Sequence, residues 1–208
     1  MKSVLCYGDS NTFGSIPGRP GTRYGFSDRW PGVLQDMLGR EWLVIPEGLS
    51  GRTTSRDDPI EGAHLNGRTY LRPCLESHRP LDLIVIMLGT NDLKARFRST
   101  AHDIGLGMAA LVGDVREVAF RTSTEVPEII LVSPPPILRD LRTWDKVFEG
   151  GFEKSRNLAS EYALVAKAQG VGFLNAGDHA SCSPVDGFHI DNTGARSLGL
   201  AIGDLIGL

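Results

Sequence analysis

The chain alternates short apolar runs with longer amphipathic segments, and this alternation restricts its fold more than any other feature of the sequence. Five apolar runs have the length of strands: residues 3–7, 42–45, 83–88, 129–132 and 171–174. Four segments have apolar side chains at helical spacing: residues 29–38, 103–120, 151–169 and 193–206. Strands that alternate with helices pair in parallel, because each helix carries the chain back across the sheet. The pattern therefore predicts an α/β fold.

Residues 83–88 are apolar at every position, as expected of a central strand that helices cover on both faces. We therefore expect a doubly wound sheet of about five parallel strands, with its functional site at the carboxyl ends of the strands. A length of 208 residues suits one domain. Since no repeat or linker divides the sequence, we expect a single domain over residues 1–208.

The charge of the chain argues against binding to nucleic acid or to a membrane surface. The formal net charge is −3, whereas nucleic acid and anionic lipid select basic surfaces. The arginines between residues 52 and 79 are mixed with acids, and we interpret this stretch as a solvated surface. No apolar run approaches the ~20 residues that span a membrane. We expect the first strand to start at about Lys2, without a secretory leader before it.

Three cysteines, Cys6, Cys74 and Cys182, are far apart in the sequence and odd in number. This spacing argues against a disulfide framework and fits a reducing compartment, so we expect a cytoplasmic protein. No group of residues has the spacing typical of metal ligands. We therefore expect neither a bound metal nor a cofactor.

Polar loops follow the first three predicted strands. Their sequences are GDSN at residues 8–11, GLSG at residues 48–51 and GTND at residues 89–92. Loops at the carboxyl edge of a parallel sheet are where α/β proteins place their chemistry. We expect these three loops to meet at one site.

Ser10 lies in the first of these loops, and an Asp–His pair lies close to the end of the chain. A serine hydroxyl is a weak nucleophile until a neighbouring base accepts its proton, and histidine is the usual base near neutral pH. His189 then needs an acceptor on its other ring nitrogen, which Asp186 can supply across Gly187. We predict that Ser10, Asp186 and His189 form a catalytic triad. A helix cap at Ser10 and a simple turn at residues 186–187 are the structural alternatives.

Asn91 and Gly51 are candidates for stabilising negative charge on a substrate oxygen. The side-chain amide of Asn91 can donate a hydrogen bond to the oxyanion of a tetrahedral intermediate. Gly51 can offer its backbone N–H at a position where the lack of a side chain lets substrate approach closely. Either residue can instead be an ordinary turn residue.

These blocks together resemble the SGNH hydrolases, also called GDSL esterases. Four blocks carry the resemblance in family order across essentially the whole chain: Gly8-Asp9-Ser10, Gly51, residues 89–92 and residues 186–189. Four further segments look like the bacterial arylesterase and acyltransferase subgroup: residues 47–54, 86–92, 133–136 and 148–151. The resemblance implies the flavodoxin-like SGNH fold, a three-layer α/β/α sandwich.

The resemblance also implies a role for each matching residue. Ser10 is the nucleophile, His189 the general base and Asp186 the group that orients it. The oxyanion hole consists of the backbone N–H of Ser10, the N–H of Gly51 and the amide of Asn91. Relatives in the subgroup commonly form homo-oligomers, and residues 133–142 are a candidate interface.

The sequence departs from the family pattern beside the serine. Asn11 stands where the family usually has an apolar residue. Phe13 and Ser15 stand where close relatives tend to carry tryptophans that line a narrow channel, so a preference for acyl transfer does not carry over directly. We expect Phe13, Ile137 and Phe188 to form walls of a small apolar pocket. Two further aromatic candidates, Trp144 and Phe148, are better explained as core.

The sequence therefore predicts a serine-dependent esterase of the arylesterase kind. It would act on short-chain acyl or aryl esters through an acyl-enzyme and would pass the acyl group to water or to an alcohol. A carbohydrate O-acetylesterase or a thioesterase can use the same catalytic groups. Two other classes are a phosphate- or nucleotide-binding protein, which the acid in the first loop disfavours, and a binding protein without activity.

Overall fold

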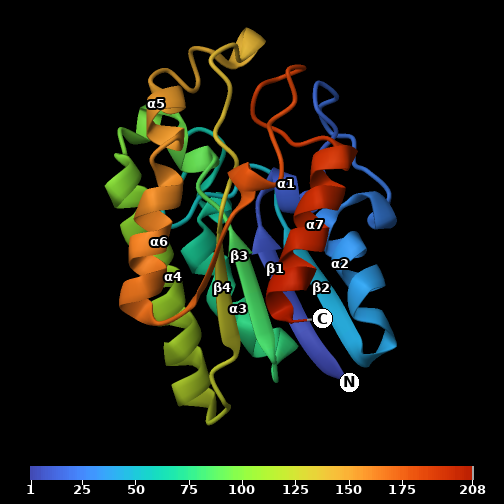
Figure 1. Cartoon of the computed structure of the whole chain (residues 1–208). Helices are drawn as coiled ribbons and strands as arrows, with labels where there is room; N and C mark the ends of the chain where they lie inside the picture. The colour runs from blue at the N-terminus through green and yellow to red at the C-terminus, as the bar shows by residue number, and fades with distance from the viewer. Residues whose placement is uncertain (208) are drawn as a thin grey trace.

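Five parallel strands form one sheet in the order β2-β1-β3-β4-β5 (Figure 1). The strands are β1 (Lys2–Gly8), β2 (Trp42–Gly48), β3 (Leu83–Met87), β4 (Glu128–Ser133) and β5 (Gly172–Asn175). The structure is a computed structural model and describes residues 1–207. Each of the five predicted strands is present, and the prediction of a parallel sheet is confirmed.

Helices cover both faces of the sheet, which makes the predicted three-layer sandwich (Figure 1). One face carries α2 (Trp30–Leu38) and α7 (Asn192–Ile206), which pack against each other. The other face carries α3 (Gly67–His78), α4 (Ala101–Thr122) and α6 (Leu158–Gln169). Two short helices, α1 (Ser10–Phe13) and α5 (Gly151–Ser155), lie above the sheet.

The alternation of side chains along β1 divides the core in two. Leu5 and Tyr7 point to the layer of α3, α4 and α6, whereas Val4 and Cys6 point to the layer of α2 and α7. All four side chains are fully buried. Because successive residues of a strand face opposite sides, an apolar residue is needed at every position of a strand covered twice. This requirement explains the continuous apolar runs in the sequence.

Two expectations about helices are wrong. Residues 67–78 form α3, although the sequence analysis interpreted this stretch as solvated surface. Gly67 and Pro73 are poor helix formers and make the helix hard to recognise in the sequence. In the structure, Asn66 caps its first turn, and Leu71 and Leu75 are buried on its inner face. The predicted helix at residues 151–169 is two helices, α5 and α6. The chain bends between them, where the hydroxyl of Ser155 bonds the backbone of Phe152 and Ile137.

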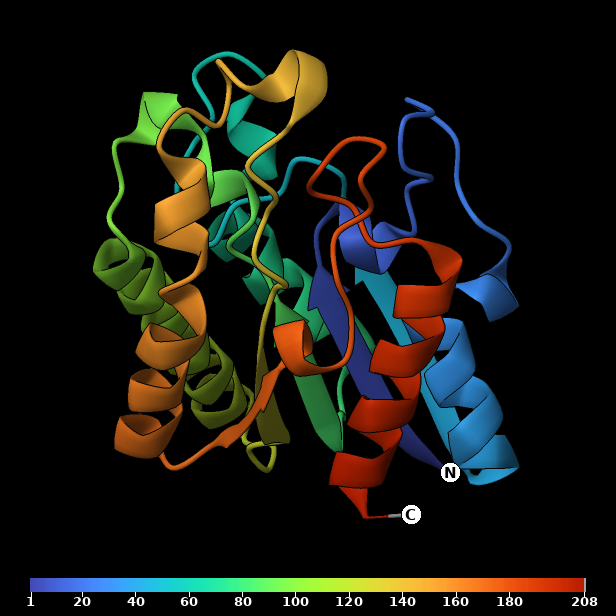
Figure 2. The same cartoon turned by 45° about the horizontal axis from the view of Figure 1, so that its top comes forward.

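The carboxyl ends of the strands all lie at one edge of the sheet, and the long loops gather there (Figure 2). The strand order reverses between β1 and β3, because β2 lies on one side of β1 and β3, β4 and β5 lie on the other. A crevice opens above such a reversal, since the chains that leave the two neighbouring strands run in opposite directions. Ser10 follows β1 directly and therefore lies at this point.

Within residues 1–207, no helix combines the length and the apolar character needed to cross a bilayer.

Candidate active site

Ser10, His189 and Asp186 lie in a continuous hydrogen-bonded chain. The Nε2 atom of His189 is 2.9 Å from the Oγ atom of Ser10. The Nδ1 atom of the same ring is 2.8 Å from the Oδ2 atom of Asp186. Ser10 begins α1 directly after β1, and His189 lies in the loop that leads to α7, so the fold brings together residues 179 positions apart. The three predicted triad residues therefore meet, at distances that allow proton transfer from the serine to the ring.

Asp186 is held as an anion. Its Oδ2 atom accepts from the histidine ring and from the backbone N–H of Gly18, and its Oδ1 atom accepts from the backbone N–H groups of Phe188 and His189. Burial by itself raises the pKa of Asp186, but these hydrogen bonds and the charge of the His189 ring outweigh it and hold the pKa below its usual range. A fixed carboxylate keeps the proton of the neutral ring on Nδ1, which leaves Nε2 free to accept from Ser10.

Asn11, the residue after Ser10, holds the loop that carries His189. Its Oδ1 atom accepts from the N–H of Ile190 at 2.9 Å, and its Nδ2 atom donates to the carbonyl of Phe188 at 3.3 Å. The side chain thus bonds the backbone on both sides of His189 and is itself buried. An apolar residue cannot form either hydrogen bond. The asparagine that departs from the family pattern therefore holds the histidine loop in place.

The three predicted oxyanion donors line one cavity with Ser10 and His189. Within residues 1–207, the backbone N–H groups of Ser10 and Gly51 donate to no protein acceptor. Gly51 has φ +87°, a left-handed conformation that favours glycine, and it lines the cavity. Asn91 begins the short 3-10 helix Asn91–Leu93 in the loop that follows β3. Two N–H groups without a protein acceptor and one side-chain amide therefore belong to residues that line the cavity of Ser10.

Asp9 and Arg52 fix the amide of Asn91. Its Nδ2 atom donates to the carbonyl of Arg52 at 3.1 Å and lies 3.4 Å from the Oδ2 atom of Asp9. Asp9 also caps α1 by accepting from the N–H of Asn11 at 2.9 Å. Burial raises the pKa of Asp9 to about 6, against the hydrogen bond from Asn11 and the charge of His189. The sequence motifs do not reveal these contacts of Asp9 and Arg52 with Asn91, because they join loops that are far apart in the chain.

Asp92 ties together the loops that follow β2 and β3. Its Oδ1 atom accepts from the hydroxyl of Thr54 at 2.6 Å, and its Oδ2 atom accepts from the N–H of Thr54 at 2.9 Å. Burial raises the pKa of Asp92 to about 6, although the bonds from Thr54 lower it. Because Gly51 and Asn91 come from these two loops, Asp92 helps to fix the positions of two of the predicted oxyanion donors relative to each other.

A cavity of about 550 Å³ opens beside the triad. Three aromatic side chains line it, and two of them contact the third. The ring centre of Phe188 is 5.3 Å from that of Trp144 and 5.1 Å from that of Phe148. Polar side chains line it as well, among them Ser15 and Ser50, whose hydroxyls are 3.2 Å apart. A volume of this size suits a small ligand.

The expected pocket walls are only partly right. Phe188 lines the cavity, as do Trp144 and Phe148. Phe148 is also part of the core, as expected, whereas Trp144 is exposed and does not belong to the core. Ile137 is buried in the core, and Phe13 stacks on the guanidinium of Arg23 at 4.0 Å, so these two are absent from the walls that residues 1–207 form. Sequence spacing cannot show which side of a loop a side chain faces. For this reason Phe13 and Ile137 were expected in the wall, and Trp144 was not.

Charged side chains form one part of the cavity rim. Lys94 is buried and lies 2.8 Å from the Oε1 atom of Glu61 and 3.5 Å from Asp58. Arg96 also pairs with both acids. Burial opposes ionisation of Asp58, but the hydrogen bonds from Arg96 and from two backbone N–H groups lower its pKa to about 2. Glu61 and Lys94 reach the cavity, so a polar substrate group would meet fixed charges there.

The sequence model of the GDSL-like lipase/acylhydrolase family matches residues 6–196. The chain belongs to this family. The match includes Ser10, the three predicted oxyanion donors and the Asp–His pair, so the family covers the whole of the candidate site described above. The predicted resemblance is thereby confirmed.

Solved structures agree with this assignment over almost the full chain. Est24, a carbohydrate acetylesterase from Sinorhizobium meliloti, is 43% identical with a TM-score of 0.95, covering 99% of this chain and 98% of that chain. The native aryl esterase of M. smegmatis is 44% identical with a TM-score of 0.94 and the same coverage of both chains. A comparison with curated proteins gives no match. The SGNH fold and the class of ester hydrolase are confirmed.

Replacing Asn11 with alanine is expected to slow catalysis as well as to destabilise the fold. The change leaves the buried N–H of Ile190 and carbonyl of Phe188 unpaired, which should lower the free energy of unfolding by about 2 kcal/mol. Without its clamp, His189 can shift, and a shift of about 1 Å can cost up to about 10²-fold in kcat. Asn157→Ala is the matched control, because it removes an exposed hydrogen bond to the carbonyl of Glu153 and Asn157 does not line the cavity. A folded Asn11→Ala enzyme with the wild-type kcat would contradict the positioning role.

The pKa of Asp92 predicts how stability changes with pH. Folding raises this pKa from 3.8 to about 6, so the folded chain holds a proton that the unfolded chain releases. The free energy of unfolding should therefore fall as the pH rises from about 4 to about 6, by about 3 kcal/mol for this group. Asp92→Asn can keep both hydrogen bonds with Thr54 without the charge, and it should remove this part of the fall. Urea unfolding at a series of pH values measures the difference, and equal slopes for both proteins would refute it.

Proposed function

We propose that this member of the family hydrolyses short-chain acyl and aryl esters through an acyl-enzyme on Ser10. The observation that carries the proposal is the hydrogen-bonded chain from Ser10 through His189 to Asp186, which opens into a small cavity. Ser10, Gly51 and Asn91 line that cavity together. A nucleophile, a base and a group of donors in one cavity are the minimum that acyl transfer requires.

The reaction would proceed in two steps. In the first, Ser10 attacks the ester carbonyl while His189 takes the hydroxyl proton, and the negative charge that forms on the carbonyl oxygen is met by the donors. The tetrahedral intermediate then collapses, and His189 returns the proton to the departing alcohol. In the second step, water or another alcohol gives its proton to His189 and attacks the acyl-enzyme, which releases the acid or a new ester and restores Ser10.

The cavity supports a preference for small acyl groups. Phe148 and Phe188 are almost completely buried, so the aromatic wall is anchored in the core and cannot move aside for a long chain. Trp144 is more exposed and lies at the outer end of the same wall. An aryl group can stack on such a wall, whereas a long alkyl chain would extend into solvent.

A carbohydrate O-acetylesterase is the second candidate, and the polar side of the cavity favours it. Ser15 and Ser50 present hydroxyls there, and Glu61 and Lys94 present fixed charges. Sugar hydroxyls need such partners when they leave water. The acetyl group would still occupy the aromatic side, so both substrate classes would use the same catalytic step.

The cellular setting and the assembly belong to the same proposal. Cys6, Cys74 and Cys182 are buried free thiols, which supports a reducing compartment and hence the cytoplasm. A homo-oligomer rests on the family resemblance. Residues 133–142 would contribute mainly charged side chains to its interface, because Ser133 and Ile137 are buried inside the chain itself and Arg139, Asp140 and Arg142 are exposed.

Ser10→Ala is expected to abolish ester hydrolysis in a protein that remains folded. Binding and the oxyanion donors alone should leave at most about 10³–10⁴-fold acceleration over the uncatalysed reaction. The measurement is hydrolysis of 4-nitrophenyl esters of graded acyl length, in which short chains should be preferred. Ser133→Ala is the matched control, because Ser133 is a buried serine at the carboxyl end of β4 and should leave the rate unchanged. Equal rates for Ser10→Ala and wild type would exclude the serine mechanism.

Asn91→Ala tests the oxyanion hole separately from the nucleophile. Loss of one preorganised donor should lower kcat by about 10²–10³-fold, with a smaller change in KM, because the donor acts mainly on the transition state. Steady-state kinetics on one short-chain ester measure both parameters. An effect confined to KM would assign Asn91 to substrate binding instead.

A further inference from the structure

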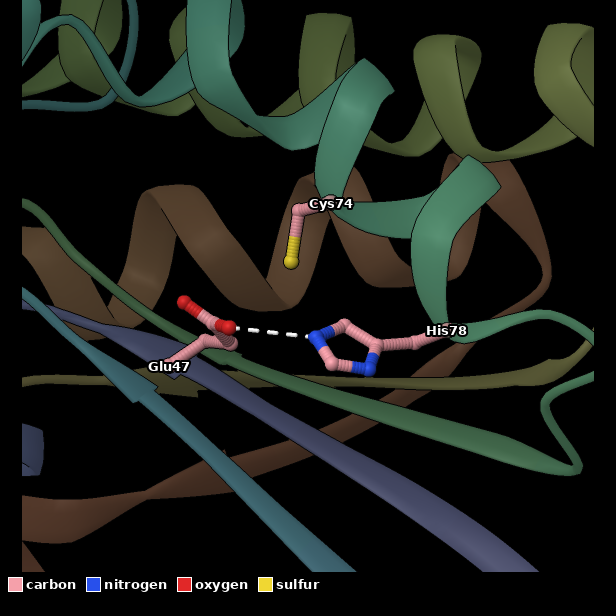
Figure 3. Close-up of side chains that lie close together, drawn as sticks. All are labelled: Glu47, Cys74 and His78. Atoms are coloured by element: carbon pink, nitrogen blue, oxygen red, sulfur yellow. Dashed lines mark hydrogen bonds and ion pairs between the residues drawn. The ribbon is translucent and has the colours of Figure 1, made fainter.

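Glu47, Cys74 and His78 lie close together on a face of the fold that the catalytic reaction does not use (Figure 3). Glu47 comes from the edge strand β2, and the other two residues come from successive turns of α3. Residues four apart on a helix point in the same direction, so Cys74 and His78 both face the strand. Figure 3 shows the thiol directed toward the space between the carboxylate and the imidazole ring.

The three side chains have the separations of ligands that share one ion. One potential ligand atom of each residue lies within 4.8 Å of the other two. The Nε2 atom of His78 is 3.1 Å from the Oε1 atom of Glu47. Two ligands at about 2.0–2.1 Å from a tetrahedral zinc ion are themselves about 3.3 Å apart, so this pair is already at the spacing that zinc requires. Within residues 1–207, the Cys74 thiol forms no hydrogen bond, which leaves its sulfur available.

The donor set selects the kind of ion. A thiolate sulfur, an imidazole nitrogen and a carboxylate oxygen together suit a borderline transition ion such as Zn²⁺, whereas Mg²⁺ and Ca²⁺ prefer oxygen ligands only. The charges also fit, because the thiolate and the carboxylate of Glu47 neutralise a divalent cation. His78 is the last residue of α3, and the partial negative charge at a helix C-terminus favours a cation there.

Without a metal, the thiol is protonated. Burial raises the pKa of Cys74 to about 12, the Glu47 carboxylate adds to this, and the Arg52 guanidinium opposes it. Metal binding forms a metal–sulfur bond and releases the thiol proton to water. The buried sulfur lies at the bottom of the site, while His78 and Glu47 are 31% and 22% exposed in their side chains. An ion can therefore enter from solvent past these two residues.

We propose that Glu47, Cys74 and His78 bind one divalent transition-metal ion, with Zn²⁺ as the best fit, and that the ion fastens α3 to the edge strand β2. Three protein ligands leave the fourth tetrahedral position to water. The expectation of no metal rested on the absence of metal-ligand spacing in the sequence, where Glu47 lies far from Cys74 and His78. The topology, and not the spacing, brings Glu47 to the helix.

The site is separated from the triad but connected to it through Arg52. The guanidinium of Arg52 donates to the carbonyls of Glu47 and Gly8 and lies 4.2 Å from the ring centre of Tyr7. The carbonyl of Arg52 accepts from the amide of Asn91. An ion at Glu47 therefore restrains a segment that continues to an oxyanion donor, while it touches no group that reacts with the ester.

Titration of the purified full-length, reduced protein with Co²⁺ tests the proposal, because cobalt reports its ligands by absorption. We expect one equivalent to bind with a thiolate-to-cobalt charge-transfer band in the near ultraviolet, and Zn²⁺ to displace it. Zn²⁺ should also raise the melting temperature of the protein. Cys74→Ala and His78→Ala should each weaken binding by at least about 100-fold, since even the loss of an outer partner of a ligand costs about 10–100-fold.

His102→Ala is the matched control. The Nδ1 atom of His102 lies 3.0 Å from the Oε2 atom of Glu161 on the surface. Among residues 1–207, no cysteine or other third ligand lies close enough to this pair to share an ion with it. This variant should bind Co²⁺ like the wild type, and ester hydrolysis by the Cys74 and His78 variants shows that they are folded. Absence of the charge-transfer band in the wild-type protein would overturn the proposal without any variant. Persistence of the band in Cys74→Ala, or undiminished binding in His78→Ala, would also overturn it.

Discussion

Parallel pairing of β1 with both β2 and β3 is the constraint on which the rest of the structure depends. It buries Leu5 and Tyr7 on one face and Val4 and Cys6 on the other, so helices must cover both sides. It also places the reversal of strand order at β1, and Ser10, the predicted nucleophile, lies two residues beyond the end of this strand. The loops after β2 and β3 flank the serine because their strands flank β1. Core packing and the position of the active site thus have one origin.

The polar groups around the serine divide into those positioned to act on substrate and those that hold them. Asp9, Asn11 and Asp92 are all buried and hydrogen-bonded to neighbouring loops. Two of these carboxylates have a raised pKa because they are buried. Such groups cost stability near neutral pH, and the chain tolerates this cost where the loops must be fixed to a fraction of an ångström. Rigidity at the site is therefore obtained at the expense of the free energy of unfolding.

One short segment at the end of β2 contributes both to the cavity and to the proposed metal site. Residues 47–52 present Gly51 to the catalytic cavity and the side chain of Glu47 to α3, on either side of one turn. Arg52 joins the two, since its side chain bonds the carbonyl of Glu47 and its own carbonyl bonds Asn91. The side chain is fully buried between Tyr7 and Tyr70. A single arginine thereby connects the proposed metal site with the oxyanion donors.

The sequence by itself determined the parallel α/β fold and the family, and it predicted the triad of Ser10, Asp186 and His189, because strand periodicity and short motifs are local properties. It missed α3, where Pro73 and many charges mask the buried stripe. The tertiary structure alone decided which aromatic rings line the cavity, that Asn11 clamps the histidine loop, and that Glu47 meets Cys74 and His78. Each of these depends on the direction of a side chain relative to a distant segment. That direction is set by packing between elements, which the order of residues does not record.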